Sequence, residues 1–540
     1  MSEWFDIIIA GGTIYDGYNE FPYKADLGIK NGRIVKIGSI EGKNCNEFIK
    51  AEGLIVSPGF IDIHTHLDFS LPVHPQADSH LMQGVTTVLV GNCGLSPVPA
   101  SIETLNELKT YTAFLAEEGF PWGFLSLNEF LEFLEKKGVA LNVASLVGHG
   151  SIRIAIMGFE DRDPTKKEME EMKCLVEEAM NDGAFGISTG LPYPPGIFSK
   201  IDELIELSKV VAKHGGIYET HLRSEGDGLL EAIEEAIAIG EKANVPVQIG
   251  HLKVAGIQNW GKSKGVLDLI EKARAKGLDI TFDQYPYDAA LNTLTSILPP
   301  WALEGGIEKA IQRLKIPKVR EEIKDYILKG SPEWKENYIK TVGWDRIMIT
   351  RCKTEKNKKL EGKNILEISK DMNKDPFEVA FDLFIEEEGS VTIITFIMDE
   401  KDIINIMKHP AGMIGTDGSF FSSGKPHPRS YGTYPRVLNK YVKHEKILSL
   451  AQAIRKMTYM PAKKLGLNDR GVIKEGAWAD IVVFDFNTIM DKATYLNPRQ
   501  YPEGIHYVLV NGKLVVKEGN FLNVFNGKIL KHNTNTNIKC

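Results

Sequence analysis

The sequence is poor in cysteine and contains no long apolar stretch. Its 540 residues include only 5 cysteines, an odd number spread widely along the chain, which argues against a framework of disulfides. No run approaches the roughly eighteen consecutive apolar residues that a membrane-spanning helix needs. The first residues also lack the basic and apolar regions of a signal peptide. We therefore expect a cytoplasmic protein without a membrane partner.

Positive charge is also in short supply. Lys and Arg number 64 against 72 Asp and Glu, a net charge of −8, so the chain shows no basic footprint for nucleic acid. With 43% hydrophobic and 25% charged residues, the composition is that of an ordinary globular protein. The chain is too long for one simple core, so we expect either a large domain with a smaller one or a single elaborated barrel. The composition gives no oligomeric state.

The two ends of the chain share one pattern. Residues 1–55 contain short apolar or alternating runs separated by glycines and by Asn31-Gly32, a dipeptide typical of a β-hairpin. Residues 465–540 repeat the pattern, with a second hairpin signal at Asn511-Gly512. We expect the two ends to meet in one small β domain.

Between these ends, residues 56–464 alternate between strand-like and helix-like segments. This alternation predicts a parallel sheet with covering helices. Eight strand candidates can be counted, the number that a TIM barrel needs. About 120 residues, at 288–411, separate the last two candidates and are interpreted as a lid or substrate insertion. The candidates are 53–66, 84–93, 141–150, 184–190, 216–223, 245–253, 278–287 and 412–419.

Imidazole, thiol and carboxylate groups stand where these candidate strands end. In a TIM barrel the active site lies at the carboxyl ends of the strands, so these distant residues are expected to converge. Together their side chains are of the types that bind zinc. The set comprises His64, His66, Cys93, His149, His221 with Arg223, His251 with Lys253, Tyr285 and Tyr287, and Asp417.

The spacing within the set is informative. His64 and His66 are two residues apart, so on a strand both point to the same face. Cys93 alone would be an ordinary buried thiol, but its place after TTVLVGN favours a metal ligand. His149 is interpreted either as a structural histidine or as one that orients a ligand. Asp68, which follows the two histidines, is expected to orient one of them.

Longer motifs make the chain similar to a known family. The segments GFIDIHTHLD, GVTTVLVGNCGLSPVP, YETHLRSEG, IGHLK and GTDGSFFSSGKPHPRSYGTYPRVL resemble the amidohydrolase superfamily and, within it, the N-acyl-D-amino-acid deacylases, or D-aminoacylases. The resemblance covers nearly the whole chain, and GNCG together with HPR-x-x-GT-x-PR is specific to the deacylase branch. It implies an α/β fold with a distorted (β/α)8 TIM-like barrel beside a small β-sandwich built from both termini. It also implies metal-dependent hydrolysis of the amide bond of small N-acyl-D-amino acids.

The resemblance further implies roles for individual residues. Cys93, His221 and His251 correspond to the ligands of one tightly held zinc ion (Zn²⁺). His64 and His66 correspond to a second metal position that is weakly or partly occupied. Asp417 corresponds to the general acid and base of the reaction. The residues expected to contact the acyl and carboxyl groups of the substrate are Tyr193, Lys253, Tyr285 and Arg429, with Arg223 as a further candidate cation.

Three departures or absences bear on the substrate. The strand candidate 184–190 ends without the carbamylated lysine of many binuclear relatives, which argues against hydrolases of cyclic amides as close kin. A dihydropyrimidinase- or dihydroorotase-like hydrolase of a cyclic amide, or a hydrolase of a dipeptide, remains the alternative. The apolar segment 293–301, TLTSILPPW, contains no cation and favours an apolar D-amino-acid side chain. After YPY the chain has DAALNT where the deacylases carry small hydroxyl residues, so the acyl preference of the family is not carried over.

Overall fold

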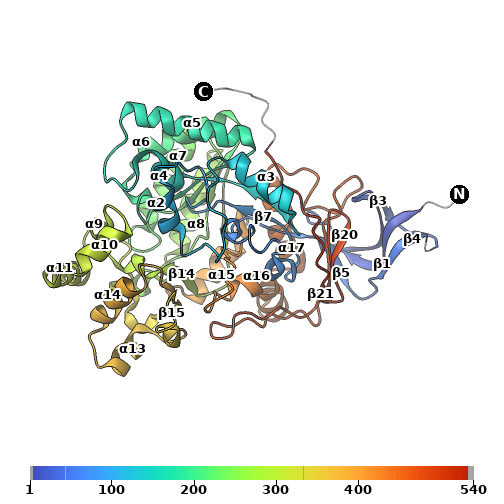
Figure 1. Ribbon diagram of the computed structural model, residues 1–540. Coiled ribbons are helices and arrows are strands. Elements are labelled where there is room, and N and C mark those ends of the chain that lie inside the picture. The colour runs from blue at the N-terminus through green and yellow to red at the C-terminus, as the bar shows by residue number, and fades with distance from the viewer. Residues whose placement is uncertain (1–3, 43, 333, 533–540) are drawn as a thin grey trace.

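Strands gather on one side of the molecule and helices on the other in the computed structural model, which describes residues 4–42, 44–332 and 334–532 (Figure 1). The first and the last strands of the chain lie together on the strand-rich side, although the whole middle of the chain separates them. The helices surround a second set of strands, which run parallel to one another. The architecture is therefore α/β with parallel sheets.

The strand-rich side is built on one nine-stranded sheet. Its strand order is β21-β20-β19-β18-β5-β1-β2-β3, with β4 paired to β1. The two chain ends meet where β5 pairs antiparallel with β18, for example at Val56 and Val483. These strands are β1 (Phe5–Ile14), β2 (Tyr23–Lys30), β3 (Arg33–Gly38), β4 (Cys45–Lys50), β5 (Ile55–Pro58), β18 (Ile481–Phe484), β19 (Ile505–Val510), β20 (Lys513–Lys517) and β21 (Asn520–Phe521).

Both hairpins predicted at Asn-Gly pairs are confirmed. Asn31 and Gly32 join β2 to β3, and Asn511 and Gly512 join β19 to β20. The φ angles of these four residues are 52°, 78°, 48° and 75°. Such left-handed values suit Asn and Gly, and two of them in succession give the turn that matches the twist of paired strands.

The parallel strands form two sheets, β6-β7-β8 and β9-β10-β11-β12-β13-β17. The last strand returns to the first, since Thr65, just after β6, forms a parallel bridge with Gly418, just after β17. Every residue of β7 and β10 is buried, as expected of strands covered on both faces. The strands are β6 (Phe60–Asp62), β7 (Val85–Val90), β8 (Asn142–Ser145), β9 (Val147–Gly148), β10 (Gly186–Gly190), β11 (Ile217–His221), β12 (Val247–Ile249), β13 (Ile280–Gln284) and β17 (Gly412–Ile414).

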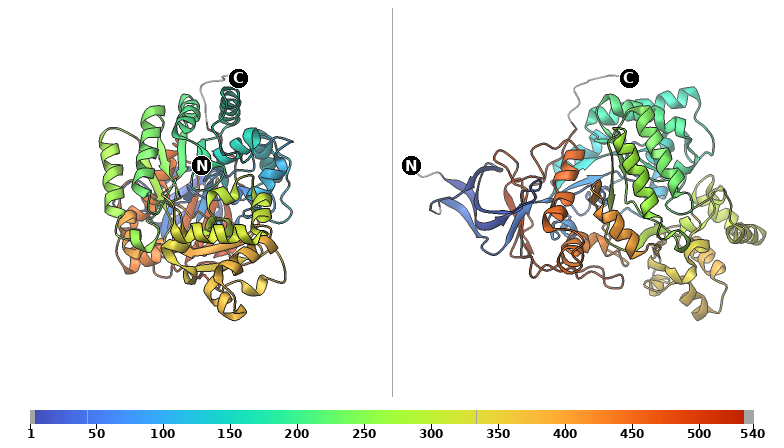
Figure 2. Two further views of the ribbon diagram at one scale, coloured as in Figure 1. Left: turned by 90° about the vertical axis from the view of Figure 1, so that its left-hand side faces the viewer. Right: turned by 180° about the vertical axis from the view of Figure 1, so that it is seen from behind.

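Amphipathic helices connect these strands and cover them (Figure 2). Each of α5 (Lys166–Asp182), α6 (Ile201–Lys213), α7 (Leu229–Ala243) and α8 (Ser263–Ala275) lies between two consecutive parallel strands and packs against its neighbouring helices. Thr165 begins α5 with a capping box, which satisfies two backbone N–H groups that the helix leaves free. Because every crossover brings the chain back to the end of the sheet where the strands begin, the carboxyl ends of all the parallel strands lie together at the other end.

Residues 289–396 depart from this alternation and build a sheet of their own, in the order β14-β16-β15. The helices α9 to α14 surround this antiparallel sheet and share a separate apolar core with it. The sequence placed the insertion at 288–411, but α15 packs instead on α8 and β17, with the helices of the parallel strands. These elements are β14 (Ala289–Thr293), α9 (Pro300–Leu303), α10 (Ile307–Leu314), α11 (Pro317–Lys329), α12 (Tyr338–Val342), β15 (Ile347–Arg351), α13 (Ile365–Met372), α14 (Pro376–Glu386), β16 (Thr392–Phe396) and α15 (Glu400–Lys408).

The last described segment of the chain returns to the parallel strands. Val143 of β8 donates its N–H to the carbonyl of Lys528 at 2.9 Å and accepts the N–H of Leu530 at 2.8 Å. Leu530 packs against a core cluster formed beneath the parallel strands. Within the described ranges, no helix combines the length and the apolar character that a bilayer crossing requires.

Candidate metal centre and active site

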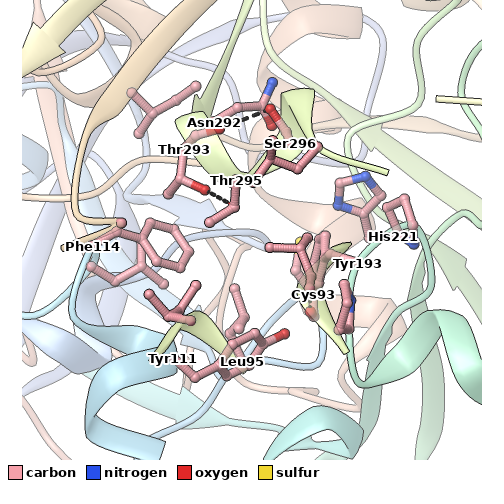
Figure 3. A pocket seen from close by; sticks show the side chains of 18 of the residues that line it. Cys93, Leu95, Tyr111, Phe114, Tyr193, His221, Asn292, Thr293, Thr295 and Ser296 are labelled. Carbon is pink, nitrogen blue, oxygen red and sulfur yellow. Dashed lines mark hydrogen bonds between the residues drawn. The ribbon is translucent and has the colours of Figure 1, made fainter. Parts of the chain in front are cut away.

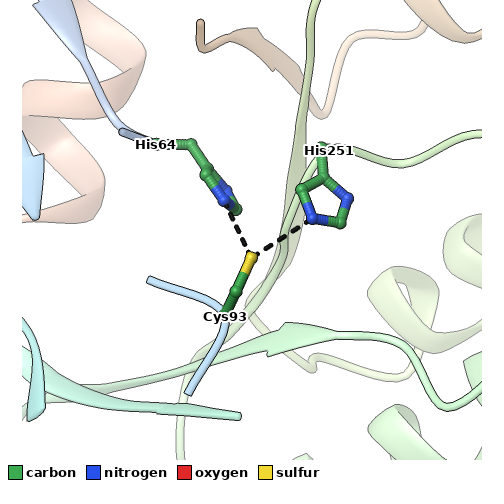
Figure 4. Close-up of side chains that lie close together, drawn as sticks. All are labelled: His64, Cys93 and His251. Carbon is green, nitrogen blue, oxygen red and sulfur yellow. Dashed lines mark hydrogen bonds between the residues drawn. The ribbon is translucent and has the colours of Figure 1, made fainter. Parts of the chain in front are cut away.

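The predicted histidines and Cys93 meet at the carboxyl ends of the parallel strands. The Sγ atom of Cys93 lies 3.2 Å from Nε2 of His64 and 3.2 Å from Nε2 of His251 (Figure 4). The ring of His221 stands edge-on to that of His251, with 4.3 Å between their centroids. His66 completes the group, with Nε2 placed 3.3 Å from Oδ1 of Asp417. Residues from five different strand ends therefore converge at one point.

The side chains in this cluster fit a divalent metal. Donor atoms lie within 4.8 Å of one another in three overlapping groups: His64, Cys93 and His251; His64, His66 and Asp417; and His221, Glu225 and His251. Imidazole, thiolate and carboxylate together are the ligand types of zinc. Nε2 of His221 is buried and has no hydrogen-bond partner in the described part of the chain. A buried nitrogen without a partner is costly, and a metal ion among these donors would satisfy it.

The protonation states of two of the histidines, His251 and His66, agree with this interpretation. Burial, and then the charge of Lys253, lowers the pKa of His251 to about 3, and burial also lowers the pKa of His66. Both imidazoles are therefore neutral at pH 7, the form that binds metals. Burial raises the pKa of the Cys93 thiol to about 12. A divalent cation beside the sulfur would reverse that shift, because it stabilises the thiolate.

Three of these residues have left-handed backbones. Cys93, His251 and Asp417 have φ angles of 57°, 34° and 48°, in a region that is uncommon for residues other than glycine, although Asp and His adopt it more often than Cys does. Each stands just past the end of its strand, where the chain turns sharply. Such a conformation costs about 1–3 kcal/mol per residue and is found most often at functional sites. The turn explains how each strand can end and still aim its next side chain at the common centre.

Buried carboxylates that were not predicted stand behind the metal-ligand candidates. Asp283 of β13 lies 3.3 Å from Nδ1 of His64 and accepts the backbone N–H of His251 at 2.9 Å. Asp283 therefore has the orienting role that was expected of Asp68. Asp68 instead accepts the N–H of Gly91 at 3.1 Å. The assignment of Asp68 is therefore corrected. The only local signal for Asp283 was its place within the strand candidate 278–287.

Two further acidic residues brace the site. Glu219 of β11 accepts the backbone N–H of Cys93 at 3.0 Å, and burial raises its pKa to about 8. Asp62 of β6 accepts the N–H groups of Thr416 at 2.9 Å and of His64 at 3.3 Å. Asp62 thus ties the segment that carries the first histidine to the segment that carries Asp417.

Several predicted residues are held by partners within the protein. Lys253 donates to Oε1 of Glu225 at 2.5 Å and lies 2.7 Å from Nδ1 of His251, so it stands behind the metal-ligand candidates. Arg223 forms an ion pair with Glu235 at 2.9 Å and donates to the carbonyl oxygens of Ile197 and Ser199. The sequence offered Arg223 as a substrate cation or an orienting residue, and these partners turn its guanidinium toward α7.

His149 has a structural environment. It is the first residue of α4 (His149–Met157), and its Nε2 lies 2.7 Å from Oε1 of Glu203 in α6. Arg153 pairs with the other oxygen of the same carboxylate at 2.6 Å. Of the two alternatives left open for His149, this buried network favours the structural one.

Arg429 lies beside Asp417. Its Nη1 is 2.8 Å from Oδ2 of Asp417, and its guanidinium lies over the ring of Tyr285, 4.6 Å from the ring centroid. Nη1 lies at the distance of an ion pair, but neither Nε nor Nη1 of Arg429 has a hydrogen-bond partner among the described residues. Burial raises the pKa of Asp417, but the charge of Arg429, together with His251, His66 and His64, outweighs burial and holds the pKa well below its usual range. The Asp417 carboxylate is therefore ionised, next to a cation that has hydrogen-bonding capacity left.

A large cavity opens onto these groups (Figure 3). Its empty volume, part of it open to solvent, is about 1370 Å³. Tyr193 lies at its wall, where its hydroxyl donates to the carbonyl of Cys93 at 2.6 Å and its ring stands edge-on to His221. Arg429 is the only Lys or Arg that lines the cavity within the described ranges. The site is therefore a largely apolar chamber in which one arginine, paired with Asp417, lies next to the cluster of imidazole, thiol and carboxylate groups.

The fold and this cluster define a metal-dependent amidohydrolase. Two models of the Amidohydrolase family match the chain, over residues 55–256 and 397–516. The chain is 36% identical to the D-aminoacylase of Alcaligenes xylosoxydans xylosoxydans over 98% of both sequences. It therefore belongs to the D-aminoacylase, or N-acyl-D-amino-acid deacylase, family.

Solved structures agree. The chain matches D-aminoacylase, described with a binuclear metal centre in which one metal activates and the second attenuates, with a TM-score of 0.82 and 36% identity, covering 98% of this chain and 100% of that one. It matches N-acyl-D-glutamate deacylase from Bordetella bronchiseptica, solved with zinc and a phosphonate mimic of the tetrahedral intermediate, with a TM-score of 0.81 and 32% identity over the same shares. The predicted resemblance to the deacylases is confirmed.

Proposed function

We propose that the protein hydrolyses the amide bond of N-acyl-D-amino acids, releasing a carboxylic acid and a free D-amino acid, with zinc as its cofactor. One observation carries the proposal: Cys93, His221, His251, Asp417 and Arg429 line a single cavity. We further propose that the two parallel sheets form one distorted (β/α)8 barrel spanning residues 56–464. The segments 1–55 and 465–540 would form the small sandwich domain.

We assign the tightly held zinc to Cys93, His221 and His251, and a second, weaker position to His64 and His66. Cys93 lies between His64 and His251, so its thiolate can serve both positions. A zinc ion held by these residues would supply a Lewis acid for the scissile carbonyl and would favour deprotonation of the attacking water.

Asp417 is the proton carrier in this proposal. Its carboxylate is ionised and lies within the cavity, 3.3 Å from Nε2 of His66. It accepts a proton from the attacking water and passes that proton to the leaving amine, the two halves of general acid–base catalysis. Arg429 keeps it ionised before the first step.

Arg429 also binds the α-carboxylate of the substrate. A guanidinium can form two parallel hydrogen bonds with a carboxylate, and Nε and Nη1 of Arg429 lack other hydrogen-bond partners among the described residues. Tyr193 is placed to donate its hydroxyl to the developing oxyanion, in exchange for its present bond to the carbonyl of Cys93. The hydroxyl of Tyr285 is buried without a hydrogen-bond partner in the described ranges and is a second candidate donor.

The cavity favours a D-amino acid with an apolar side chain. An acidic side chain such as that of D-glutamate would need a second cation, because burying an unpaired carboxylate is costly. Arg429 is already engaged by the α-carboxylate, and no other Lys or Arg lines the described cavity. We expect N-acetyl-D-leucine to be hydrolysed faster than N-acetyl-D-glutamate, and the reverse order would overturn this preference.

Metal content and enantioselectivity test the proposal together. Zinc is measured by mass spectrometry on the wild type and on Cys93→Ala, and hydrolysis of N-acetyl-D-methionine and N-acetyl-L-methionine is measured on the same samples. We expect one or two zinc ions per chain and D-selective hydrolysis, with both lost in Cys93→Ala. Hydantoin and dihydroorotate serve as the comparison for the alternative function. Faster turnover of either cyclic amide would move the proposal to that class.

A further inference from the structure

The lining of the cavity reaches from the catalytic end to the insertion, and its walls differ in character. Asn292, Thr293, Thr295 and Ser296, from β14 and the turn after it, form a polar wall on one side of Figure 3. Leu95 and Tyr111 stand on the opposite side, and the catalytic end is marked by Cys93, Tyr193 and His221. Two substituents of different chemistry would therefore find different surfaces.

The apolar wall runs without interruption from the catalytic end to the insertion. Leu95 and Tyr111 pack with Cys93 and Tyr193 in one hydrophobic cluster. The ring of Tyr111 meets the ring of Phe159 edge-on, with 5.4 Å between centroids. Both rings line the cavity, so the wall continues outward along them.

The far end of this wall is closed by the insertion. Phe159 packs beside Gly306, where a β-carbon would lie 3.8 Å from Cδ2 of Phe159. Leu303 and Ile307, on either side of that glycine, also line the cavity. Residues 289–396 thus form the roof of an apolar compartment. Its floor comes from segments that connect the parallel strands, with Leu95 and Tyr111 between β7 and β8 and Phe159 between β9 and β10.

The chemistry of the amide bond decides which substituent enters this compartment. The nitrogen side of the scissile bond carries the D-amino acid, and its carboxylate and amine are bound by Arg429 and Asp417. The acyl substituent lies on the carbonyl carbon and points away from those two residues. Tyr193, whose hydroxyl bonds to Cys93, stands at the beginning of the apolar wall, and no described contact joins it to Arg429. The wall of Leu95, Tyr111 and Phe159 is therefore on the acyl side.

Resting on the function proposed above, we propose that the preferred substrates carry a medium-chain fatty acyl group rather than acetyl. The acyl chain lies along Leu95, Tyr111 and Phe159 and ends against Leu303 and Ile307. The polar wall of Asn292 and its neighbours is left for the amide-bearing half of the substrate. Each methylene that leaves water for an apolar wall gains a roughly constant free energy, corresponding to about fourfold in binding.

The experiment is a chain-length series on the metal-loaded enzyme. Acetyl, butyryl, hexanoyl and octanoyl derivatives of D-leucine are compared by kcat/KM, below the concentrations at which they form micelles. We expect kcat/KM to rise by about threefold to fourfold per added methylene up to the length at which the compartment is full. Rates that stay flat or fall beyond acetyl, with the acetyl derivative well hydrolysed, overturn this inference and leave the deacylase function intact. Hydrolysis of none of the four overturns the deacylase function itself.

Two variants test where the acyl chain of the substrate lies. Phe159→Ala removes part of the wall and is expected to lower the octanoyl-to-acetyl ratio of kcat/KM by at least about tenfold. Leu303→Trp fills the far end and is expected to lower the same ratio. The control is Phe133→Ala, which removes another half-buried ring, on α3 (Leu127–Lys137), that packs against Phe124 outside the cavity. An unchanged ratio in both Phe159→Ala and Leu303→Trp would place the chain elsewhere and overturn the assignment.

Discussion

Asp417 and Arg429 form an ion pair, with 2.8 Å between Oδ2 and Nη1, and they stand at the two ends of one loop. Residues 418–428 connect them. This loop therefore positions both the proposed proton carrier and the proposed ligand of the substrate carboxylate, and a change in the loop displaces both.

Asp417→Asn is expected to reduce kcat by about a thousandfold, because a neutral amide cannot accept the proton of the attacking water. The tightly held zinc should be retained, since Cys93, His221 and His251 are unchanged. Steady-state kinetics with N-acetyl-D-methionine and metal analysis of the same sample check both statements. A near-normal kcat would remove Asp417 from the mechanism.

Arg429→Lys keeps the charge but loses the planar fork that grips a carboxylate. We expect KM to rise about tenfold or more while kcat falls less, because the lost contact is made in the ground state as well as in the transition state. The matched substrate is the amide of N-acetyl-D-leucine, which lacks the carboxylate. The variant and the wild type should differ much less on that compound, and an equal loss on both would contradict the assignment.

Arg499 holds the shared loop from the C-terminal part of the chain. Its guanidinium donates to the carbonyl oxygens of Phe421 at 2.9 Å, Ser423 at 2.6 Å and Gly424 at 2.9 Å. Arg499→Ala leaves these carbonyls without that partner, so we expect kcat/KM to fall about tenfold, with KM affected more than kcat. The measurement is a full kinetic profile together with the thermal midpoint of unfolding.

The control for Arg499 is Arg455→Ala, which removes another arginine that donates to a single carbonyl, that of Tyr18. Its kinetic constants should match those of the wild type. If Arg499→Ala lowered the thermal midpoint and left KM unchanged, its role would be structural only. Partial recovery of KM in Arg499→Lys would support positioning of the loop.

Much of the candidate site could be predicted from the sequence, because histidine, cysteine and aspartate stood at the ends of separate strand candidates. The strands themselves are shorter than the candidates: β12 ends at Ile249 and β17 at Ile414, before His251 and Asp417. Periodicity cannot locate such an ending, since the turn is set by left-handed backbone at the functional residue itself. The order of the metal-ligand candidates along the chain could be predicted from the sequence. The backbone conformation that directs their side chains toward the common centre could not.

The parts that the sequence did not reveal depend on tertiary contacts. Asp283 stands behind His64 only because β13 and β6 face the same interior, and Asp68 was a better guess from distance along the chain. Lys253 and Arg223 were chosen for their charge, yet each has a partner on another segment: Glu225, in the loop after β11, pairs with Lys253, and Glu235, in α7, pairs with Arg223. Ion pairing of this kind leaves no periodicity or motif in the sequence. The sequence therefore could not show which cations can bind a substrate and which are paired with carboxylates of the protein.

Lys464 should make the stability of the folded protein depend on pH. Its Nζ donates to the carbonyl of Val247 at 2.9 Å, and burial lowers its pKa to about 8, against about 10.4 in an unfolded chain. Between these values the unfolded state binds more protons than the folded state, so the contribution of Lys464 to stability increases as the pH rises through this window. Below pH 8 the folded protein bears the cost of a buried charge.

The comparison of wild type with Lys464→Met isolates this effect, because other groups titrate equally in both. We expect the difference in thermal midpoint to change in favour of the wild type between pH 8 and 10. A difference that stays constant over this range, or changes in the other direction, would contradict the depressed pKa.

Gly527 marks where the last described segment lies against the parallel strands. Its N–H donates to the carbonyl of Val139 at 2.8 Å, and a β-carbon added to it would lie 2.0 Å from the carbonyl oxygen of Leu141. Gly527→Ala therefore forces the segment away from the start of β8 and weakens the pairing of Val143 with Lys528 and Leu530. We expect a loss of about 1–3 kcal/mol, as for other overpacked sites, seen as a lower thermal midpoint.

The matched control is Gly265→Ala in α8, where the nearest heavy atom to a new β-carbon is Leu230 Cδ2 at 3.8 Å. Gly265 is the third residue of α8, and alanine has the higher helix propensity, so this variant should be neutral or more stable. Equal midpoints for Gly527→Ala and Gly265→Ala would mean that the C-terminal segment adds nothing to the stability of the parallel strands. A lower midpoint for Gly527→Ala alone, with kcat/KM retained, would show that the segment supports the strands without contributing to the site at their opposite ends.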